Sequence, residues 1–72
     1  MTNAEKIELL EEMMELDEGI LSEETLLDEV EEWDSMAYLS LIILMGDKFG
    51  KKISAKEIKA FEKVSDILDY MG

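Results

Sequence analysis

Asp34-Ser35 is the pair of residues in this sequence that most clearly points to a chemical function. Ser35 follows Asp34 directly, and the apolar pattern after the pair predicts a helix that begins at one of these two residues. At such a position, free N–H groups and the positive end of the helix dipole stabilise a phosphate ester on a hydroxyl. Asp-Ser is also a common way to begin any helix, so a plain cap is the alternative interpretation.

The composition limits what Ser35 can do by itself. The chain has no histidine and no cysteine, and all seven of its basic residues are lysines. A histidine base, a cysteine nucleophile, a disulfide and a zinc site with thiolate or imidazole ligands are therefore excluded. A Ser-Lys pairing has no supporting motif. We therefore expect Ser35 to be a modified residue and the chain not to be an enzyme.

The first two helices are predicted from apolar spacing and capping residues. Thr2 and Glu5 form a capping box for the first helix. The second begins at Asp34 or Ser35 and runs to about Phe49. The residues expected to face the core from these two helices are Ala4, Ile7, Leu10, Met14, Tyr38, Leu41, Ile42, Met45 and Phe49.

Two shorter helices are predicted after Gly50, which acts as a helix stop. Ser54 and Glu57 form a second capping box, for a short third helix. A last helix is predicted from apolar residues at steps of three and four. The apolar residues spaced for this last helix are Val64, Ile67, Leu68 and Met71.

Residues 16–33 form a long connection between the first two helices. A structureless loop of this length is unusual in so small a domain, so its apolar residues are expected to be held in the core. These residues are Leu21, Leu26, Leu27 and Val30. No segment alternates with period two long enough to predict a strand. The sequence therefore predicts a single all-α domain over residues 1–72, a small four-helix bundle with a long first connection and a short third helix.

The outward face of the second helix is half apolar, which is unusual for a surface helix. It carries Met36, Ser40, Ile43 and Asp47. Either this face is a docking surface, or the 16–33 connection covers it. Trp33 leaves a similar choice between a partner anchor and a half-buried residue that closes the connection onto the core.

The charge is strongly uneven along the chain. Nineteen acidic residues against seven lysines give a net charge of −12, and the acidic excess lies upstream of Ser35, with Glu31 and Glu32 close to it. This sign disfavours nucleic-acid binding and favours a basic protein partner, although acidity also simply maintains solubility. No apolar run approaches the length of a membrane span, and the first residues lack the layout of a secretion signal. We expect a cytoplasmic monomer.

A set of apolar and motif residues occurs at spacings that are typical of one protein family. They are Trp33-Asp34-Ser35-Met36, Leu39, Leu41, Ile42, Phe49-Gly50, Ile53, Val64 and Ile67-Leu68-Asp69-Tyr70-Met71. Together they resemble the acyl carrier protein family over almost the whole chain, most closely from Asp34 to Met71. The resemblance implies an acyl-carrier-like bundle in which Ser35 carries a 4′-phosphopantetheine arm. Asp34 is then the acidic residue before the attachment site, and Met36 replaces the usual leucine, which is close to a volume-conserving exchange.

The resemblance also implies the cofactor's source and the partners. A phosphopantetheinyl transferase attaches the arm from coenzyme A with magnesium, and the thiol of the arm then holds acyl groups as thioesters. Acyl-loading and acyl-processing enzymes with basic patches are the further partners. A chain without cysteine needs such an arm to form thioesters at all.

Departures from the family pattern concern the last helix and the partner surface. Lys63 stands where the family often has a threonine cap, so the last helix is expected to begin later, at Ser65. Ser40 and Gly46 stand where fatty-acid carriers usually place glutamates, Lys48 follows Asp47, and the third helix carries two lysines. The acidic cluster at residues 28–32 is a candidate replacement. The resulting hypothesis is a specialised carrier for a fatty-acid-like, polyketide or related pathway.

Two other functions compete with that of a carrier. A calcium loop starting at Asp17 fails, because Gly19 and Leu21 occupy positions that require oxygen ligands. An acidic helical interaction module without a cofactor remains open, because nothing in the composition excludes it.

Overall fold

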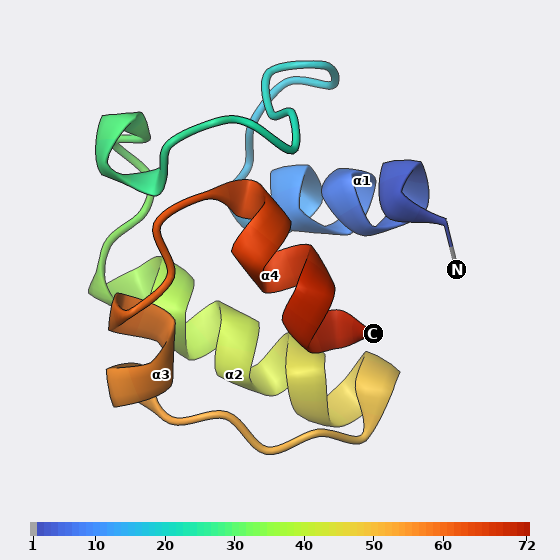
Figure 1. The fold of residues 1–72 in the computed structure, drawn as a ribbon, viewed down its shortest axis with the longest axis vertical. Helices are drawn as coiled ribbons and strands as arrows, with labels where there is room; N and C mark the ends of the chain where they lie inside the picture. The colour runs from blue at the N-terminus through green and yellow to red at the C-terminus, as the bar shows by residue number, and fades with distance from the viewer. Residues whose placement is uncertain (1) are drawn as a thin grey trace.

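The computed structural model describes residues 2–72, and over this range it is a small all-α fold with four α-helices and no strand (Figure 1). The helices are α1 (Asn3–Met13), α2 (Ser35–Phe49), α3 (Ala55–Lys59) and α4 (Val64–Met71), with a short 3-10 turn at Leu27–Glu29. This confirms the helical class, the long first connection and the short third helix. Within residues 2–72, no helix has the length and apolar character needed to cross a membrane.

Local capping explains where α1 and α3 begin. The Thr2 hydroxyl accepts from the Glu5 amide at 3.2 Å, and the Glu5 carboxylate accepts from the Thr2 amide at 3.0 Å. The hydrogen bond from the Thr2 amide favours the ionised carboxylate, so it lowers the pKa of Glu5. Ser54 and Glu57 repeat the arrangement at α3, with both backbone bonds at 3.2 Å. Both predicted capping boxes are confirmed.

A glycine in the left-handed conformation ends α2. Gly50 ends α2 in the left-handed region, with φ of 61°, and the Lys51 amide then donates to the Met45 carbonyl at 3.0 Å. A residue with a Cβ atom is strained at such a φ, which is why glycine stands there.

The predicted start of α4 at Ser65 is wrong. The helix begins at Val64, because the Asp66 carboxylate accepts from the backbone amides of Glu62 and Lys63, at 2.9 and 3.1 Å. These bonds also lower the pKa of Asp66. The amides of Val64 and Ser65, the first two residues of α4, donate to the carbonyls of Thr25 and Glu23, so backbone acceptors of the first connection replace the missing capping side chain.

The core combines residues from all four helices and the first connection. Its buried apolar members are Leu10, Met14, Leu21, Leu27, Ala37, Leu41, Met45, Ile53, Ile58, Val64, Ile67, Leu68 and Met71. Most of the expected core residues are buried or half-buried, but Ala4 and Leu26 are not. Ala4 lies exposed in the first turn of α1. Leu26 is 43% exposed because the backbone around it is extended, so that its side chain and that of buried Leu27 leave on opposite sides.

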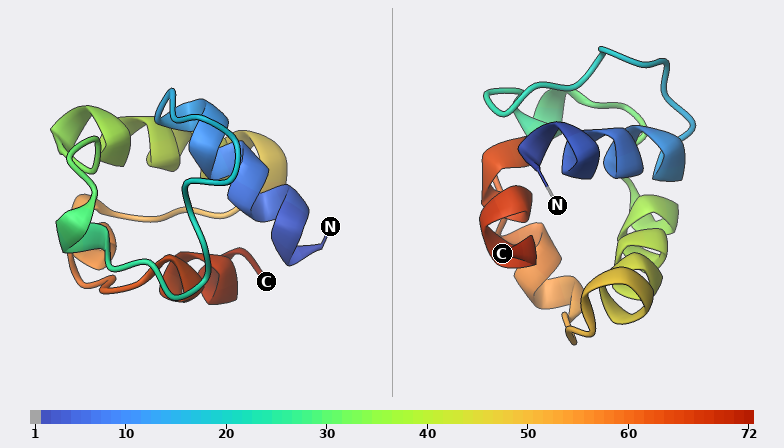
Figure 2. Two further views of the ribbon diagram at one scale, coloured as in Figure 1. Left: turned by 90° about the horizontal axis from the view of Figure 1, so that it is seen from above. Right: turned by 90° about the vertical axis from the view of Figure 1, so that its right-hand side faces the viewer.

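The first connection is tied to the segment that leads into α4. The amide of Leu27 donates to the Glu62 carbonyl at 2.9 Å, and the amide of Val64 donates to the Thr25 carbonyl at 3.0 Å. A third bond runs from the Ser65 amide to the Glu23 carbonyl, also at 3.0 Å. Figure 2 shows the connection passing alongside α4. The long segment before Ser35 is therefore ordered by the opposite end of the chain.

Candidate functional site

Ser35 is the first residue of α2, and its side chain is exposed to solvent. The helix behind it has 15 residues, so the positive end of a full helix dipole faces this hydroxyl. Within the described part of the chain, the Ser35 hydroxyl has no hydrogen-bond partner. An attached group would therefore meet no packed neighbour that has to move aside.

Asp34 supplies the cap of this helix. Its Oδ1 atom accepts from the amides of Met36 and Ala37, at 3.1 Å each. These are two of the N–H groups that a helix start leaves without partners inside the helix. Because Asp34 satisfies them, the neighbouring hydroxyl of Ser35 is not needed for capping. The predicted helix start and the predicted cap are both confirmed.

Trp33 fixes the chain just before this cap. The indole ring is half-buried and packs edge-on against Tyr38, with ring centroids 5.1 Å apart and planes inclined by 69°. Such an edge-to-face pair adds to the apolar burial of both rings. Trp33 thus agrees with the half-buried alternative, and a role as partner anchor stays a prediction.

The outward face of α2 is uncovered. Met36, Leu39 and Ile43 are 74%, 56% and 58% exposed, and we name these three residues the α2 stripe. Met36 and Ile43 were assigned to this face from the sequence. Because both are exposed, the alternative in which the first connection covers them is wrong. Asp47 is exposed at the far end of the helix. Leu39 was not assigned to this face from the sequence, although its spacing of three and four residues from the other two members indicates it.

Ser40 lies differently, since it is half-buried and turned toward α1. It lines an open groove of about 290 Å³ between the end of α1 and the start of α2, which we name the α1–α2 groove. The lining residues are Met13, Met14, Glu15, Glu32, Asp34, Met36, Ala37 and Ser40. Apolar side chains and three carboxylates therefore meet directly beside Ser35. Glu31 is exposed in the turn before it but does not line the groove.

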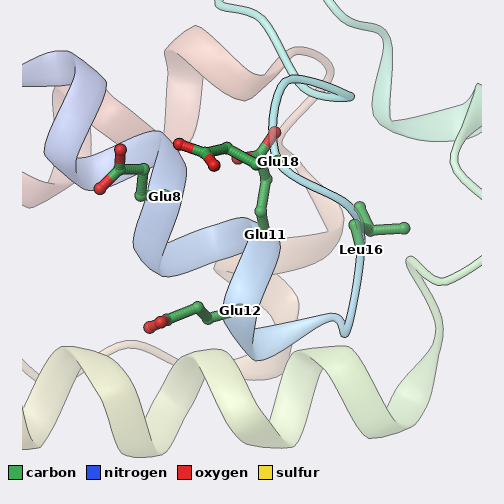
Figure 3. A pocket seen from close by; sticks show the side chains of 5 residues that line it. All are labelled: Glu8, Glu11, Glu12, Leu16 and Glu18. Carbon is green, nitrogen blue, oxygen red and sulfur yellow. The ribbon is translucent and has the colours of Figure 1, made fainter.

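A second open cavity, of about 300 Å³, lies between α1 and the first connection. Figure 3 shows its lining residues, with Glu11 extending toward the connection and Glu12 pointing away from it. Glu11 is only 3% exposed, and its Oε2 atom accepts from the amides of Gly19 and Leu21 at 3.0 and 2.9 Å. The role of Glu11 is therefore to hold the connection. Among residues 2–72, no group of three or more acidic side chains is arranged to hold a metal ion.

The arrangement around Ser35 suits a group-accepting hydroxyl. The cap is complete without it, the helix dipole favours a phosphate oxygen beside it, and an apolar stripe starts at the next residue. The sequence has neither histidine nor cysteine, so no imidazole or thiolate group stands beside the hydroxyl. Comparison of the chain with protein-family models, with curated proteins and with solved structures gives no match.

Proposed function

We propose that this chain is an acyl carrier, in which Ser35 bears a 4′-phosphopantetheine arm whose thiol holds acyl groups as thioesters. The observation that carries the proposal is the exposed, unbonded Ser35 hydroxyl at the start of a helix whose cap is completed by Asp34. A phosphate ester at this position gains from the positive end of the α2 dipole. The carrier itself performs no catalysis in this proposal.

The number and lengths of the helices and connections also support the proposal, although they do not concern Ser35 itself. Four helices with a long first connection and a short third helix match what the resemblance to acyl carrier proteins implies. The absence of cysteine from the sequence is consistent with a thiol that arrives on a cofactor. The arm would come from coenzyme A, through a phosphopantetheinyl transferase that works with magnesium.

Intact-protein mass spectrometry tests this function directly. The chain is incubated with coenzyme A, magnesium and a phosphopantetheinyl transferase, and its mass is compared before and after. We expect a gain equal to one phosphopantetheine group. We expect no gain for Ser35→Ala and the full gain for Ser54→Ala, which removes the serine at the start of α3 instead. Absence of a gain with several different transferases would contradict a carrier function.

The second candidate is an acidic interaction module without a cofactor. The exposed α2 stripe beside an acidic chain half favours it, because a solvent-facing apolar stripe is typical of a protein-binding surface. This candidate predicts partner binding with no change of mass in the transferase experiment.

The pathway served is a separate part of the proposal. Ser40 lies half-buried against α1 and Gly46 has no side chain, so neither offers the charge that fatty-acid carriers usually present on this helix. We therefore place the carrier in a dedicated pathway, either fatty-acid-like or polyketide-like. Replacement of a housekeeping carrier in fatty-acid elongation tests this point, and full support of elongation would contradict it.

A further inference from the structure

The α2 stripe lies between two flanks of opposite charge. The right-hand view of Figure 2 shows α1 above α2 and α3 to the left of α2, and both helices contact α2. The flank toward α1 is the groove with its three carboxylates, from Glu15, Glu32 and Asp34. The flank toward α3 carries the exposed lysines Lys56 and Lys59.

The lysines of this second flank are free to meet a partner. In the part of the chain that the structure describes, the one ion pair joins Lys63 and Glu24, at 3.6 Å. Lys56 and Lys59 therefore pair with no carboxylate there, in a protein whose net charge is −12. The carboxylate of Glu57 between them accepts from the backbone and hydroxyl of Ser54 and offsets one of the two positive charges. Helix α3 thus keeps a net charge of +1 over residues 55–59, against the three carboxylates of the other flank.

The acidic flank has room for a long basic side chain. Met13, Met14 and Ala37 give the α1–α2 groove apolar walls, and the carboxylates stand beside them. An arginine or lysine side chain combines an aliphatic stem with a charged end, so it can bury the stem against the methionines while its charge meets the carboxylates. A volume of about 290 Å³ is sufficient for one such side chain.

We propose that the α2 stripe docks on a partner protein whose matching surface is divided by charge. Apolar side chains of the partner meet the stripe, basic side chains enter the α1–α2 groove, and carboxylates face Lys56 and Lys59. A partner that is basic throughout would place positive charge against these lysines and lose part of its attraction. The proposal rests on the proposed function for the view that the partner is an enzyme that visits Ser35. It adds to that function the charge pattern by which the partner is selected.

Two synthetic helical peptides of identical composition test this surface. Both have a leucine stripe. The divided peptide has arginines along one flank of the stripe and glutamates along the other, and the mixed peptide alternates the same residues on both flanks. Their dissociation constants for the unmodified 72-residue chain are measured by fluorescence anisotropy at low ionic strength. We expect the divided peptide to bind about tenfold more tightly, which is the effect of several exposed charge pairs acting together.

Charge-reversal variants locate the effect. Lys56→Glu with Lys59→Glu, or Glu15→Lys with Glu32→Lys, should each remove the preference for the divided peptide. All four changes together exchange the two flanks, and they should restore the preference, because a helical peptide can bind in the opposite direction. Such a rescue is not expected if the reversals merely damage the fold.

Several outcomes would overturn the proposal. These are equal affinity for the two peptides, no binding of either, or sedimentation of the chain alone as a dimer, which would place a second copy on the stripe. Ser35→Ala separates this proposal from the carrier function, since it should abolish arm addition and leave peptide binding unchanged. A preserved peptide preference without arm addition would contradict only the carrier function.

Discussion

Ser35 and Ser54 both stand at the start of a helix, but only Ser54 is used as a cap. The Ser54 hydroxyl accepts from the Glu57 amide and donates to the Glu57 carboxylate, at 3.2 Å each. Ser35 is one position further along its helix, and Asp34 makes the corresponding bonds in its place. A shift of one residue relative to the helix start thus separates a structural hydroxyl from one that is available to another protein.

The comparison of Ser35 with Ser54 indicates which serines at helix starts are available for modification. A serine at a helix start is available for modification when the residue before it can satisfy the free amides. Asp-Ser meets this condition, whereas a serine that occupies the cap position itself does not. Three substitutions test how the starts of α2, α3 and α4 are stabilised.

The largest effect is expected from Asp34→Ala. The change leaves the amides of Met36 and Ala37 without their acceptor, and we expect the free energy of unfolding to fall by about 1–2 kcal/mol. Urea denaturation measures it. Asp34→Asn is the matched control, because it keeps an oxygen at the same position and should recover most of the stability. If the Asp34→Ala protein is as stable as the wild type, the Asp34 carboxylate does not cap α2, and the claim that Ser35 is not needed as a cap loses its basis.

A smaller and more telling effect is expected from the two serines. Ser54→Ala should cost about 1 kcal/mol of unfolding free energy, because it removes a cap. Ser35→Ala should change the free energy of unfolding by less than about 0.5 kcal/mol, as is usual for an exposed side chain without special contacts. Both are measured by the same urea denaturation. If Ser35→Ala costs as much as Ser54→Ala, the Ser35 hydroxyl is structural and the carrier proposal loses its main support.

The smallest effect concerns α4, which begins without a capping side chain. The amides of Glu62 and Lys63 hold the pKa of Asp66 below its ordinary value of 3.8, so the ionised carboxylate is stabilised in the folded chain. This stabilisation is present above the pKa of the unfolded chain and is lost as pH falls through the lower, folded pKa. We therefore expect wild type to exceed Asp66→Asn in stability at pH 7, with a difference that shrinks toward pH 3. Urea denaturation at both pH values measures it, and a difference independent of pH would contradict this account.

Much of the fold follows from local sequence signals. The starts of α1, α2 and α3 and the end of α2 were predicted correctly, because each depends on residues within one turn of the boundary. The predicted start of α4 was wrong, because its first two amides donate to the backbone carbonyls of Thr25 and Glu23, which are far away in the sequence, and not to a local capping side chain.

Other features depend on contacts that a local pattern does not contain. Glu11 and Lys6 are buried although both are charged, and no spacing rule distinguishes them from the exposed glutamates of the same helix. The burial of Glu11 depends on a loop eight to ten residues away that donates two amides to it. Charged residues of this kind are rarely fully buried unless they are paired, so the sequence favours the wrong assignment.

In the candidate site, too, some features follow from the local sequence and others depend on contacts between distant segments. The positions of Asp34 and Ser35 at the start of α2 follow from the sequence, and the exposure of Met36 and Ile43 agrees with one of the two alternatives that it left open. The α1–α2 groove was not predicted, because it is formed where the end of α1 meets residues 32–40. The half-buried position of Ser40 has the same origin, since α1 covers one side of the outward face.

The hydrogen bonds between residues 23–27 and 62–65 have a consequence for how the molecule forms. They close a chain loop of about 35 residues, which contains all of α2 and α3. The conformational entropy lost in closing such a loop has to be met before these bonds can form, whereas the helices require only near neighbours along the chain. The helices are therefore expected to form early and this closure late, so that the approach to Ser35 becomes ordered only when the last helix docks.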